Sequence, residues 1–459
     1  NYFTSGAVLG YVAGNRATLS DIQSATGKDV NSRNEDPQYT SATDLTPQNP
    51  NLDEAGDNLT SEVSEDVNGL TRTVPVSMGA VEYNAVATAL SGSYTIGSGG
   101  DYTTFLSAID AMRINGISGA VVFNVLSGTY NEQFEILPVS GSSAINTVTF
   151  QSQSGNAGDV TIRHTAVGVS DNYVVRFTDA SHVLLKDLTL ESQGVTYGRV
   201  IENVATTLDD ILVEGCIIKS PVLSSTSQNM STVFLQPSVS NGIRFIGNTI
   251  SGGSEGIYYR SSSSGALGVG CEFRDNVLSD IYYRGLWFQY FTGLIVSGNQ
   301  VNISSSSYSQ SLGISLNISN GSQQVVGNRI INPNQYGLYL SSCAGSSGSE
   351  ALVTNNMIMT KGSSSSHYGI YSTSSQYHRF YHNSINVISS GRGLYYSNGS
   401  NNQIKNNIFK VATGEAIRLQ NQTGLVAIDY NNYFSSGSIL GYVVGNRATL
   451  ADIQSATGK

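Results

Sequence analysis

Two adjacent aspartates, Asp209 and Asp210 in the segment TLDDILVEG, are the first candidates for acid–base chemistry in this sequence. Two carboxyl groups held several ångströms apart can serve as general acid and general base on a glycosidic bond. Neighbouring residues on a strand point to opposite faces, so this pair would need further partners. We expect both to be solvated acids at a turn, and we predict no catalytic residue and no enzymatic activity.

The histidines and cysteines do not complete a catalytic or metal-binding motif. The three cysteines have no metal-ligand spacing, and we expect them to be buried as small hydrophobic residues. No histidine lies in a metalloprotease or triad context, and we expect His378 and His382 to face solvent. The sequence therefore predicts no cofactor and no bound metal. The residues are Cys216, Cys271, Cys343, His164, His182, His367, His378 and His382.

One sequence word recurs at steps of 23 to 32 residues and centres on an asparagine. The Asn follows an apolar pair and a small or polar residue, and an apolar residue usually stands two positions later. Because residues two apart share a strand face, we expect the amides to face the core or a turn and to hydrogen-bond from coil to coil. The predicted ladder comprises Asn248, Asn276, Asn299, Asn328, Asn356, Asn383, Asn407 and Asn432, with Cys216 in the first place.

A second word, Gly followed by Ile or Leu, alternates with the first. The second residue after this Gly should point outward, and in most copies it is aromatic: Tyr258, Trp287, Tyr339, Tyr371 and Tyr395, with Ser315 and Arg418 in the remaining copies. Two interpretations stay open. The rings form a stacked ladder that stabilises neighbouring strands, or they form a contact strip for glycan rings or a neighbouring fibre.

Two strand words that alternate once per ~25 residues are typical of a coiled solenoid. In a parallel β-helix, corresponding residues of successive coils stack at one strand spacing, roughly 4.8 Å. We therefore predict an all-β fold, a right-handed parallel β-helix solenoid with short capping helices, over residues 93–431.

The two ends of the chain repeat each other. Residues 1–28 and 432–459 are identical at 23 of 28 positions. We interpret 1–28 as the end of a preceding unit and 432–459 as the corresponding end of this one. The expected partners are adjacent copies, joined head to tail.

Residues 29–92 differ from the rest and read as an acidic, proline-containing connector. They hold eleven acids and two arginines, a charge of −9 out of the total of −10. Asp66, Asn68 and Gly69 resemble part of a calcium loop, but the twelve-residue spacing is missing, so Ca²⁺ binding there is unsupported. The acidic balance argues against nucleic-acid binding, and no apolar run is long enough to span a membrane.

Beyond these patterns, the chain resembles known proteins. The segments GSGGDYTTFLSAID and VVFNVLSGTYNEQ are similar to the opening of pectin-lyase-like right-handed β-helix proteins, pectinesterases included, where a helix plugs the open end of the coil. The segments YTSATDL, EDVNGLTR and VSMGAVEY resemble the closing part of β-helix modules in giant tandem-repeat secreted surface proteins of the Bacteroidota type. The resemblance implies an extracellular location on the cell surface.

We predict from this a structural repeat unit of an extracellular filament, stalk or adhesin, with glycans or other cells as further partners. The alternative is a polysaccharide-acting enzyme, lyase or hydrolase, or a glycan-binding module on the same fold. The conserved words of pectinesterases are missing, and the Asn-Thr-Asp word of polygalacturonases is missing as well. This favours the structural interpretation.

Overall fold

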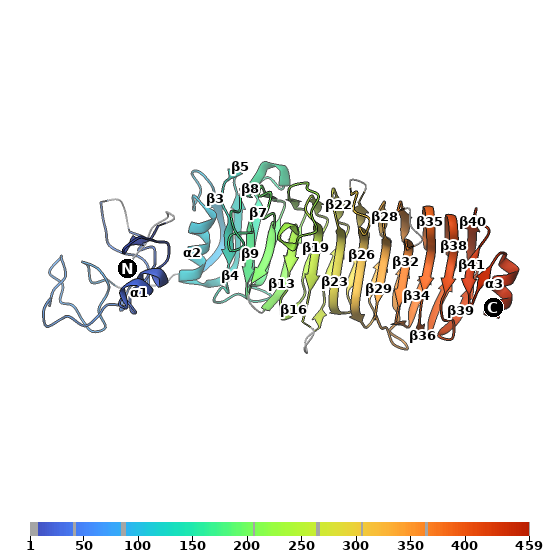
Figure 1. Ribbon diagram of the computed structural model, residues 1–459. Coiled ribbons are helices and arrows are strands. Elements are labelled where there is room, and N and C mark those ends of the chain that lie inside the picture. The colour runs from blue at the N-terminus through green and yellow to red at the C-terminus, as the bar shows by residue number, and fades with distance from the viewer. Residues whose placement is uncertain are drawn as a thin grey trace. The chain divides into compact units, whose positions relative to one another are not determined.

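The structure, a computed structural model, describes residues 8–39, 43–83, 89–204, 207–262, 267–303, 306–362 and 366–458. Residues 92–109 and 119–459 form one compact unit, and residues 1–91 with 110–118 form another. The larger unit is the predicted right-handed parallel β-helix, in which each strand pairs with strands one coil before and after it (Figure 1). No helix among the described residues is long and apolar enough to cross a membrane.

Three stacks of parallel strands form the sides of the β-helix, and we name them sheets A, B and C. Sheet A contains β6 (Phe134–Ile136), β9 (Val175–Thr178), β12 (Ile201–Val204), β15 (Val233–Leu235), β19 (Glu255–Arg260), β23 (Arg284–Thr292), β26 (Leu312–Asn320), β29 (Tyr336–Ser341), β32 (Tyr368–Thr373), the later parts of β35 (Ser384–Tyr396) and β38 (Ile408–Leu419), and β41 (Gly441–Val443).

Sheet B precedes the asparagine turn in each coil. It contains β4 (Ile117–Val125), β7 (Val148–Ser152), β10 (Ser181–Lys186), β13 (Thr207–Glu214), β17 (Arg244–Ile246), β21 (Glu272–Arg274), β24 (Ile295–Ser297), β27 (Gln324–Val326), β30 (Ala351–Thr354), β34 (His378–Tyr381), β37 (Asn402–Lys405) and β39 (Leu425–Asp429).

Sheet C follows that turn. It contains β5 (Gly128–Tyr130), β8 (Val160–His164), β11 (Thr189–Ser192), β14 (Ile217–Lys219), β18 (Thr249–Ser251), β22 (Val277–Ser279), β25 (Gln300–Asn302), β28 (Arg329–Ile331), β31 (Met357–Thr360), the first parts of β35 and β38, and β40 (Asn432–Ser435).

The remaining elements are short. They are α1 (Leu19–Thr26), α2 (Phe105–Asn115), α3 (Leu450–Thr457), the 3-10 turns η1 (Ala157–Asp159) and η2 (Gln228–Met230), and the strands β1 (Gly10–Tyr11), β2 (Asn15–Arg16), β3 (Leu90–Ile96), β16 (Val239–Asn241), β20 (Gly268–Val269), β33 (Ser375–Gln376), β36 (Gly399–Ser400) and β42 (Asn446–Arg447).

Stacked apolar side chains fill the interior of the coils. The rings of Phe245 and Phe273, in adjacent strands of sheet B, lie 5.6 Å apart and nearly parallel. At the start of α2, the fully buried Phe105 stacks on Phe134 of the first coil, with 4.8 Å between ring centroids. Burial of this apolar surface is the main stabilising term for a fold in which each coil contacts its neighbours.

A two-residue turn joins sheets B and C and explains the asparagine words. The residue before each ladder position adopts a left-handed conformation, as Asp275 does with φ 55° and Gly327 with φ 68°. Gly, Asp and Asn tolerate this conformation better than other residues, and they fill most of these places. The turn therefore selects the residue before each asparagine as well as the asparagine itself.

The asparagine side chains form a hydrogen-bonded ladder inside this turn. Asn276 is representative: its Nδ2 donates to Asn299 Oδ1 at 3.0 Å and to the Phe245 carbonyl at 2.8 Å. Its backbone N–H donates to the same Asn299 oxygen at 3.1 Å. The pattern links Asn248, Asn276, Asn299, Asn328, Asn356, Asn383 and Asn407, all at most 1% exposed.

The prediction of Asn432 as the last rung is wrong. Asn407 donates from its backbone and its side chain to Asn431 Oδ1, at 3.0 and 2.9 Å, so Asn431 is the rung. Asn432 begins β40, pairs with Ile408 and is exposed. The word DYNNYF holds two adjacent asparagines, and a register error of one residue moves a side chain to the opposite face.

Candidate functional site

The aromatic residues predicted to face outward lie in a single column on the outer surface of sheet A. Strand register places one member of the column in each coil. We call this set the outer column; it reads Glu135, Arg176, Glu202, Phe234, Tyr258, Trp287, Ser315, Tyr339, Tyr371, Tyr395, Arg418 and Tyr442.

The rings of the outer column stack face to face. Tyr258 and Trp287 lie 4.5 Å apart with 7° between their planes, and Tyr371 and Tyr395 lie 4.7 Å apart with 3° between theirs. Tyr339 continues the second stack, 5.2 Å from Tyr371. Because neighbouring rings cover each other's faces, the column offers ring edges and hydroxyl groups to a ligand. Ser315 separates the two stacks, so only the rings inside a stack have both faces covered by neighbouring rings.

Three consecutive tyrosines of the outer column have hydroxyl groups without a hydrogen-bond partner among the described residues. Within the described residues, the hydroxyls of Tyr339, Tyr371 and Tyr395 form no hydrogen bond, and all three side chains are half-buried. The Tyr258 hydroxyl, by contrast, accepts a hydrogen bond from Gln236 Nε2 at 3.1 Å. Burial, followed by the neighbouring phenols, raises the pKa of Tyr371. Its hydroxyl therefore remains a donor as well as an acceptor at neutral pH.

A second outward column runs beside the first and was missed from the sequence. Its members stand directly before the glycine of the Gly word or its equivalent, so aligning that position across the copies would have found them. In coil order it reads Glu255, Arg284, Leu312, Tyr336, Tyr368, Arg392 and Glu415.

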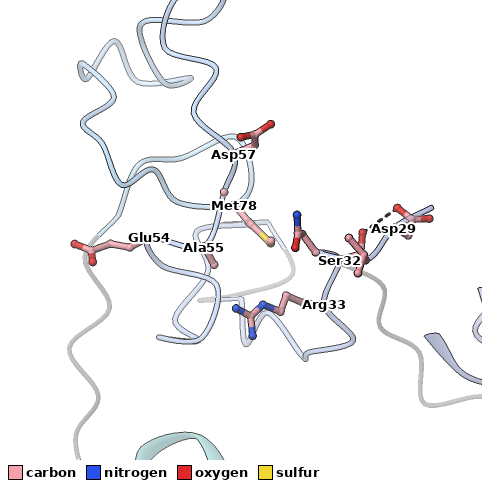
Figure 2. Close-up of a pocket in the computed structure, with 10 residues that line it drawn as sticks. Asp29, Ser32, Arg33, Glu54, Ala55, Asp57 and Met78 are labelled. Carbon is pink, nitrogen blue, oxygen red and sulfur yellow. Dashed lines mark hydrogen bonds between the residues drawn. The ribbon is translucent and has the colours of Figure 1, made fainter. Parts of the chain in front are cut away.

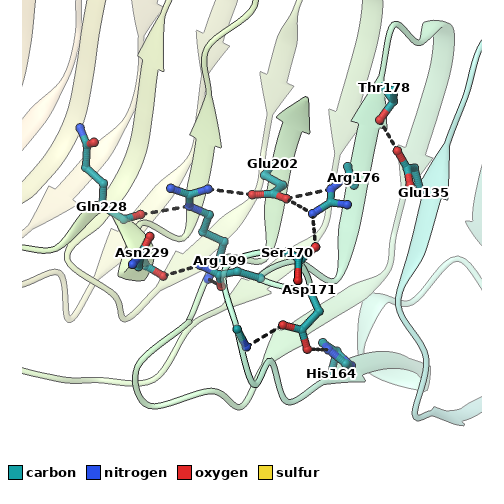
Figure 3. Close-up of polar contacts among 12 residues, drawn as sticks. Glu135, His164, Ser170, Asp171, Arg176, Thr178, Arg199, Glu202, Gln228 and Asn229 are labelled. Carbon is teal, nitrogen blue, oxygen red and sulfur yellow. Dashed lines mark hydrogen bonds and ion pairs between the residues drawn. The ribbon is translucent and has the colours of Figure 1, made fainter. Parts of the chain in front are cut away.

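Glu202 lies between two arginines at the N-terminal part of the outer column (Figure 3). Its Oε1 accepts hydrogen bonds from Arg176 Nε at 2.8 Å and Nη2 at 2.7 Å, and its Oε2 accepts from Arg199 Nη1 at 2.8 Å. The Glu202 side chain is only 3% exposed. Arg199 also lies 3.7 Å above the Phe234 ring. Charge-assisted bonds of this kind fix both arginines in place.

The same arrangement recurs at the C-terminal part of the column. Glu415 accepts from Arg392 Nε at 2.9 Å and from Arg418 Nη1 at 2.7 Å. Arg418 lies 3.9 Å above the Tyr442 ring. Each Arg–Glu–Arg bracket holds two guanidinium groups and one carboxylate, so both carry a net charge of +1. The two brackets stand on either side of the tyrosines, on a chain whose net charge is −10.

Glu255 is the most buried carboxyl group on this face. It is 1% exposed, accepts a hydrogen bond from the Ser231 hydroxyl at 2.6 Å, and pairs with Arg284 at 3.0 Å. Burial raises the pKa of Glu255, against the opposing effect of Arg284. A buried carboxyl with a raised pKa beside a surface of aromatic residues is a candidate for proton transfer.

The aspartate pair does not form a two-carboxylate site. Asp210 is held in a cluster, with His182 Nδ1 at 3.1 Å and Arg244 Nη2 at 2.6 Å from its two oxygens. Asp209 lies in β13 opposite Ser181 and Asn241. Asp210 adopts a left-handed conformation within β13, with φ 49°, and both aspartates are half-buried, so they are not the solvated turn acids that we expected.

The expectation that His378 faces solvent is wrong. His378 is fully buried, and its Nε2 lies 3.0 Å from Gln323 Nε2. Burial lowers the pKa of His378 to about 4. The position is inward because it starts β34, in register with the buried Ala351. Cys216, Cys271 and Cys343 are buried free thiols, as predicted.

The smaller unit contains a polar hollow of about 900 Å³ (Figure 2). Asp29, Arg33, Glu54 and Asp57 are among the residues that line it, and Asp29 Oδ1 accepts a hydrogen bond from Ser32 at 2.9 Å. Across the described part of the chain, no group of three His, Cys, Asp or Glu side chains is placed to hold a metal ion.

The carboxylate of Asp66, the residue considered for calcium binding, accepts hydrogen bonds from backbone N–H groups. Its Oδ1 accepts from Asn68 N at 2.7 Å and from Leu70 N at 2.8 Å, and its Oδ2 accepts from Glu82 N at 3.0 Å. The bonds from Asn68 and Leu70 close a turn, and the bond from Glu82 joins this turn to the later segment that contains Glu82.

Comparison with known families gives a partial match. Residues 196–387 match the family described as periplasmic copper-binding protein (NosD). This span lies wholly within the β-helix. No curated protein sequence matches the chain.

Solved structures with a similar fold include three enzymes. They are the GH136 lacto-N-biosidase from Eubacterium ramulus (10% identity, 74% of this chain and 67% of that chain, TM-score 0.49), the A-module of mannuronan C-5 epimerase AlgE6 from Azotobacter vinelandii (14%, 74% and 91%, 0.44), and the pectin methylesterase from Aspergillus niger (14%, 77% and 88%, 0.27). At these identities the likeness concerns the fold.

The prediction that this unit is not an enzyme is contradicted by these neighbours. Motifs of two enzyme families are missing from this chain, whereas the lacto-N-biosidase and the epimerase are further enzymes with a similar fold. Absence of two motif sets is therefore no ground for excluding catalysis.

Proposed function

We propose that this chain binds a polysaccharide along the outer face of sheet A. The observation that carries the proposal is a row of hydroxyls on Tyr339, Tyr371 and Tyr395 that have no hydrogen-bond partner among the described residues, one in each of three consecutive coils. A hydroxyl group donates and accepts hydrogen bonds, as do the hydroxyls of a sugar. A surface that repeats at the coil spacing, roughly 4.8 Å, suits a ligand that is itself a repeating chain.

The charges beside the tyrosines favour an acidic polysaccharide. Arg176, Arg199, Arg392 and Arg418 outnumber the two carboxylates that they bracket. Their geometry is fixed before a ligand arrives, which reduces the conformational entropy lost on binding. A polymer with carboxylate or sulfate groups would gain from both brackets while its hydroxyls contact the tyrosines between them.

Removal of the three hydroxyls tests this proposal without disturbing the ring stacks. The variant Tyr339→Phe/Tyr371→Phe/Tyr395→Phe keeps every ring, so we expect an unchanged melting temperature and at least a tenfold loss of affinity for acidic polysaccharides. Tyr430→Phe is the matched control, because Tyr430 is 79% exposed and lies outside both columns. Equal affinities of parent and triple variant would refute the proposal.

As a second candidate we propose that the same face acts on the polysaccharide chemically. Glu255 supports this, because its buried carboxyl has a raised pKa and lies beside the aromatic stack. A carboxyl group with a raised pKa keeps its proton to a higher pH and can serve as a general acid. Turnover of pectin or alginate that is lost in Glu255→Gln, with binding retained, would support this candidate, and the absence of turnover on a broad panel would contradict it.

The setting we propose is outside the cytoplasm, as part of a cell-surface filament or adhesin built from tandem β-helix modules. Two features support it: the duplication of residues 1–28 at 432–459, and a partial match to a family described as periplasmic. Ca²⁺ binding has no support in the contacts of Asp66.

A further inference from the structure

An apolar groove lies on the outer face of sheet C, a different side of the β-helix from the columns on sheet A. It has a volume of about 340 Å³ and crosses four consecutive strands, β28, β31, β35 and β38, of which β28, β35 and β38 are labelled in Figure 1. Strand β25 pairs with β28 before the groove, and β40 pairs with β38 after it. The groove therefore belongs to the middle of the stack of coils.

Outward methionine and isoleucine side chains form the walls of this groove. Met357 and Ile408, which are 60% and 48% exposed, stand on either side of the smaller Ser384 in one outward column. Ile331 and Met359 are half-buried neighbours in the second outward column of the same sheet. Because Ser384 is small, it leaves a depression between the larger side chains. Contiguous exposed apolar side chains mark binding sites, and the flexible thioethers of methionine adapt to apolar ligands.

Two cations border the apolar walls without an acidic partner. Arg329 and Lys410 line the groove, and both residues are exposed. Among the described residues, neither side chain forms an ion pair or a hydrogen bond, and none of the residues that line the groove is acidic. On a chain with a net charge of −10, this is a local positive surface. Charge complementarity therefore favours a ligand that is anionic as well as apolar.

The size of the groove favours a small molecule over a protein partner. Its volume lies at the lower end of the range for small-molecule sites, about 300–1,000 Å³. A stable protein interface buries about 1,200–2,000 Å² in total, whereas the outward residues of the preceding strand, Gln300 and Asn302, are polar and end the apolar surface on that side. A two-fold contact between two copies would place the same patch against itself and bring Arg329 and Lys410 against like charges.

We infer that the groove on sheet C binds a single-chain fatty acid. The carboxylate would lie beside the two cations, and the alkyl chain would lie against Met357, Met359 and Ile408. This ligand matches the three properties of the groove, which are apolar walls, a positive border and a small volume. The inference concerns a different face from sheet A and does not depend on polysaccharide binding.

Titration of the full chain with decanoate, followed by NMR of labelled methionine methyl groups, tests this inference. The chain has five methionines, so the spectrum is simple. Decanoate should shift the signals of Met357 and Met359 saturably, whereas those of Met112 and Met230, which are 1% and 2% exposed, should not move. Butyrate lacks the long chain and decyltrimethylammonium lacks the anion, so each should bind at least tenfold more weakly than decanoate.

Removal of the two cations tests the charge term separately. Arg329→Gln/Lys410→Gln should lower the affinity for decanoate at least tenfold and leave the melting temperature unchanged, because both side chains are exposed and have no partner among the described residues. Lys219→Gln is the matched control, since Lys219 is exposed on sheet C and lies outside the groove. The control should bind decanoate as the parent does.

Three results would overturn the inference. One is an equal affinity for decanoate in the parent and in Arg329→Gln/Lys410→Gln. Another is binding to phosphatidylglycerol vesicles without saturable binding of decanoate, which would make the groove a membrane contact. The third is a shift of the Met357 and Met359 signals when the protein concentration alone is raised, which would show that a second copy covers the groove.

Discussion

The side-chain amide of Asn328 donates one hydrogen bond to Asn356 Oδ1 at 3.0 Å and another to the Val296 carbonyl at 2.9 Å. The Asn328 oxygen in turn accepts from the backbone and the side chain of Asn299. One buried amide thus satisfies polar groups in the preceding and the following coil and links three successive coils. This relationship explains why the turn between sheets B and C holds asparagine in coil after coil.

Replacing Asn328 by leucine should therefore destabilise the β-helix. The change leaves groups of both neighbouring rungs without partners, at about 1–3 kcal/mol for each buried group. We expect a lower melting temperature in thermal unfolding followed by circular dichroism. Asn432→Leu is the matched control, since Asn432 is exposed and lies outside the ladder. Equal losses in the two variants would contradict the ladder's role.

The charged brackets should also contribute to stability. Glu202→Ala leaves Arg176 and Arg199, 14% and 12% exposed, without their shared carboxylate. Removing one partner of a buried ion pair costs about 3–5 kcal/mol. The control is Glu272→Ala, because the Arg274–Glu272 pair is more exposed, at 42% and 24%, and such pairs contribute about 0–1 kcal/mol. Denaturant unfolding should separate the two variants, and similar midpoints would argue against the bracket as a stabilising unit.

A strained residue in sheet A offers a stabilising substitution. Ile318 adopts the left-handed conformation with φ 50°, while Ser342 and Ser374 adopt it in the next two coils. For an L-residue this conformation costs about 1–2 kcal/mol, and β-branched side chains are among the least suited to it. Ile318→Gly should raise the melting temperature, whereas Ile318→Val should leave it unchanged. A lower melting temperature for the glycine variant would show that Ile318 packing outweighs the strain.

Acid should destabilise the protein partly through His378. Burial lowers the pKa of His378 to about 4 from its ordinary value of 6.5. Below pH 6.5 the unfolded chain binds a proton that the folded chain excludes, so the free energy of unfolding falls as the pH drops towards 4. The slope for one proton is at most about 1.4 kcal/mol per pH unit. His378→Asn should flatten the dependence between pH 6.5 and 4, and an unchanged slope would contradict this assignment.

The β-helix and most of its asparagine ladder were predictable because both rest on local periodicity. The turn between sheets B and C needs a residue in the left-handed conformation followed by Asn, and this pair recurs in successive coils. The prediction failed at Asn431 because the adjacent Asn432 satisfies the same word, and only strand register separates the two. The inward position of His378 could not be predicted for a similar reason. The equivalent position is Ala351 in the preceding coil and Asn402 in the following coil, so no single residue type marks it as buried.

The ion pairs on sheet A could not be predicted from the sequence for a different reason. Arg176 and Glu202 are 26 residues apart, and their contact depends on the register of adjacent coils. The position before each glycine alternates between Glu, Arg, Leu and Tyr, so no single residue type marks it. The orientation of the rings is likewise set by stacking across coils, which composition does not reveal.

The most direct test of polysaccharide binding on sheet A uses Trp287, the only tryptophan in the chain. Trp287 stacks on Tyr258 in the outer column, so its fluorescence reports on the proposed face. Titration with oligosaccharides from pectin or alginate should give a saturable change in emission, shifted to higher concentration in Tyr339→Phe/Tyr371→Phe/Tyr395→Phe. Binding detected by calorimetry with no change in Trp287 emission, and equal affinity in the triple variant, would contradict the account.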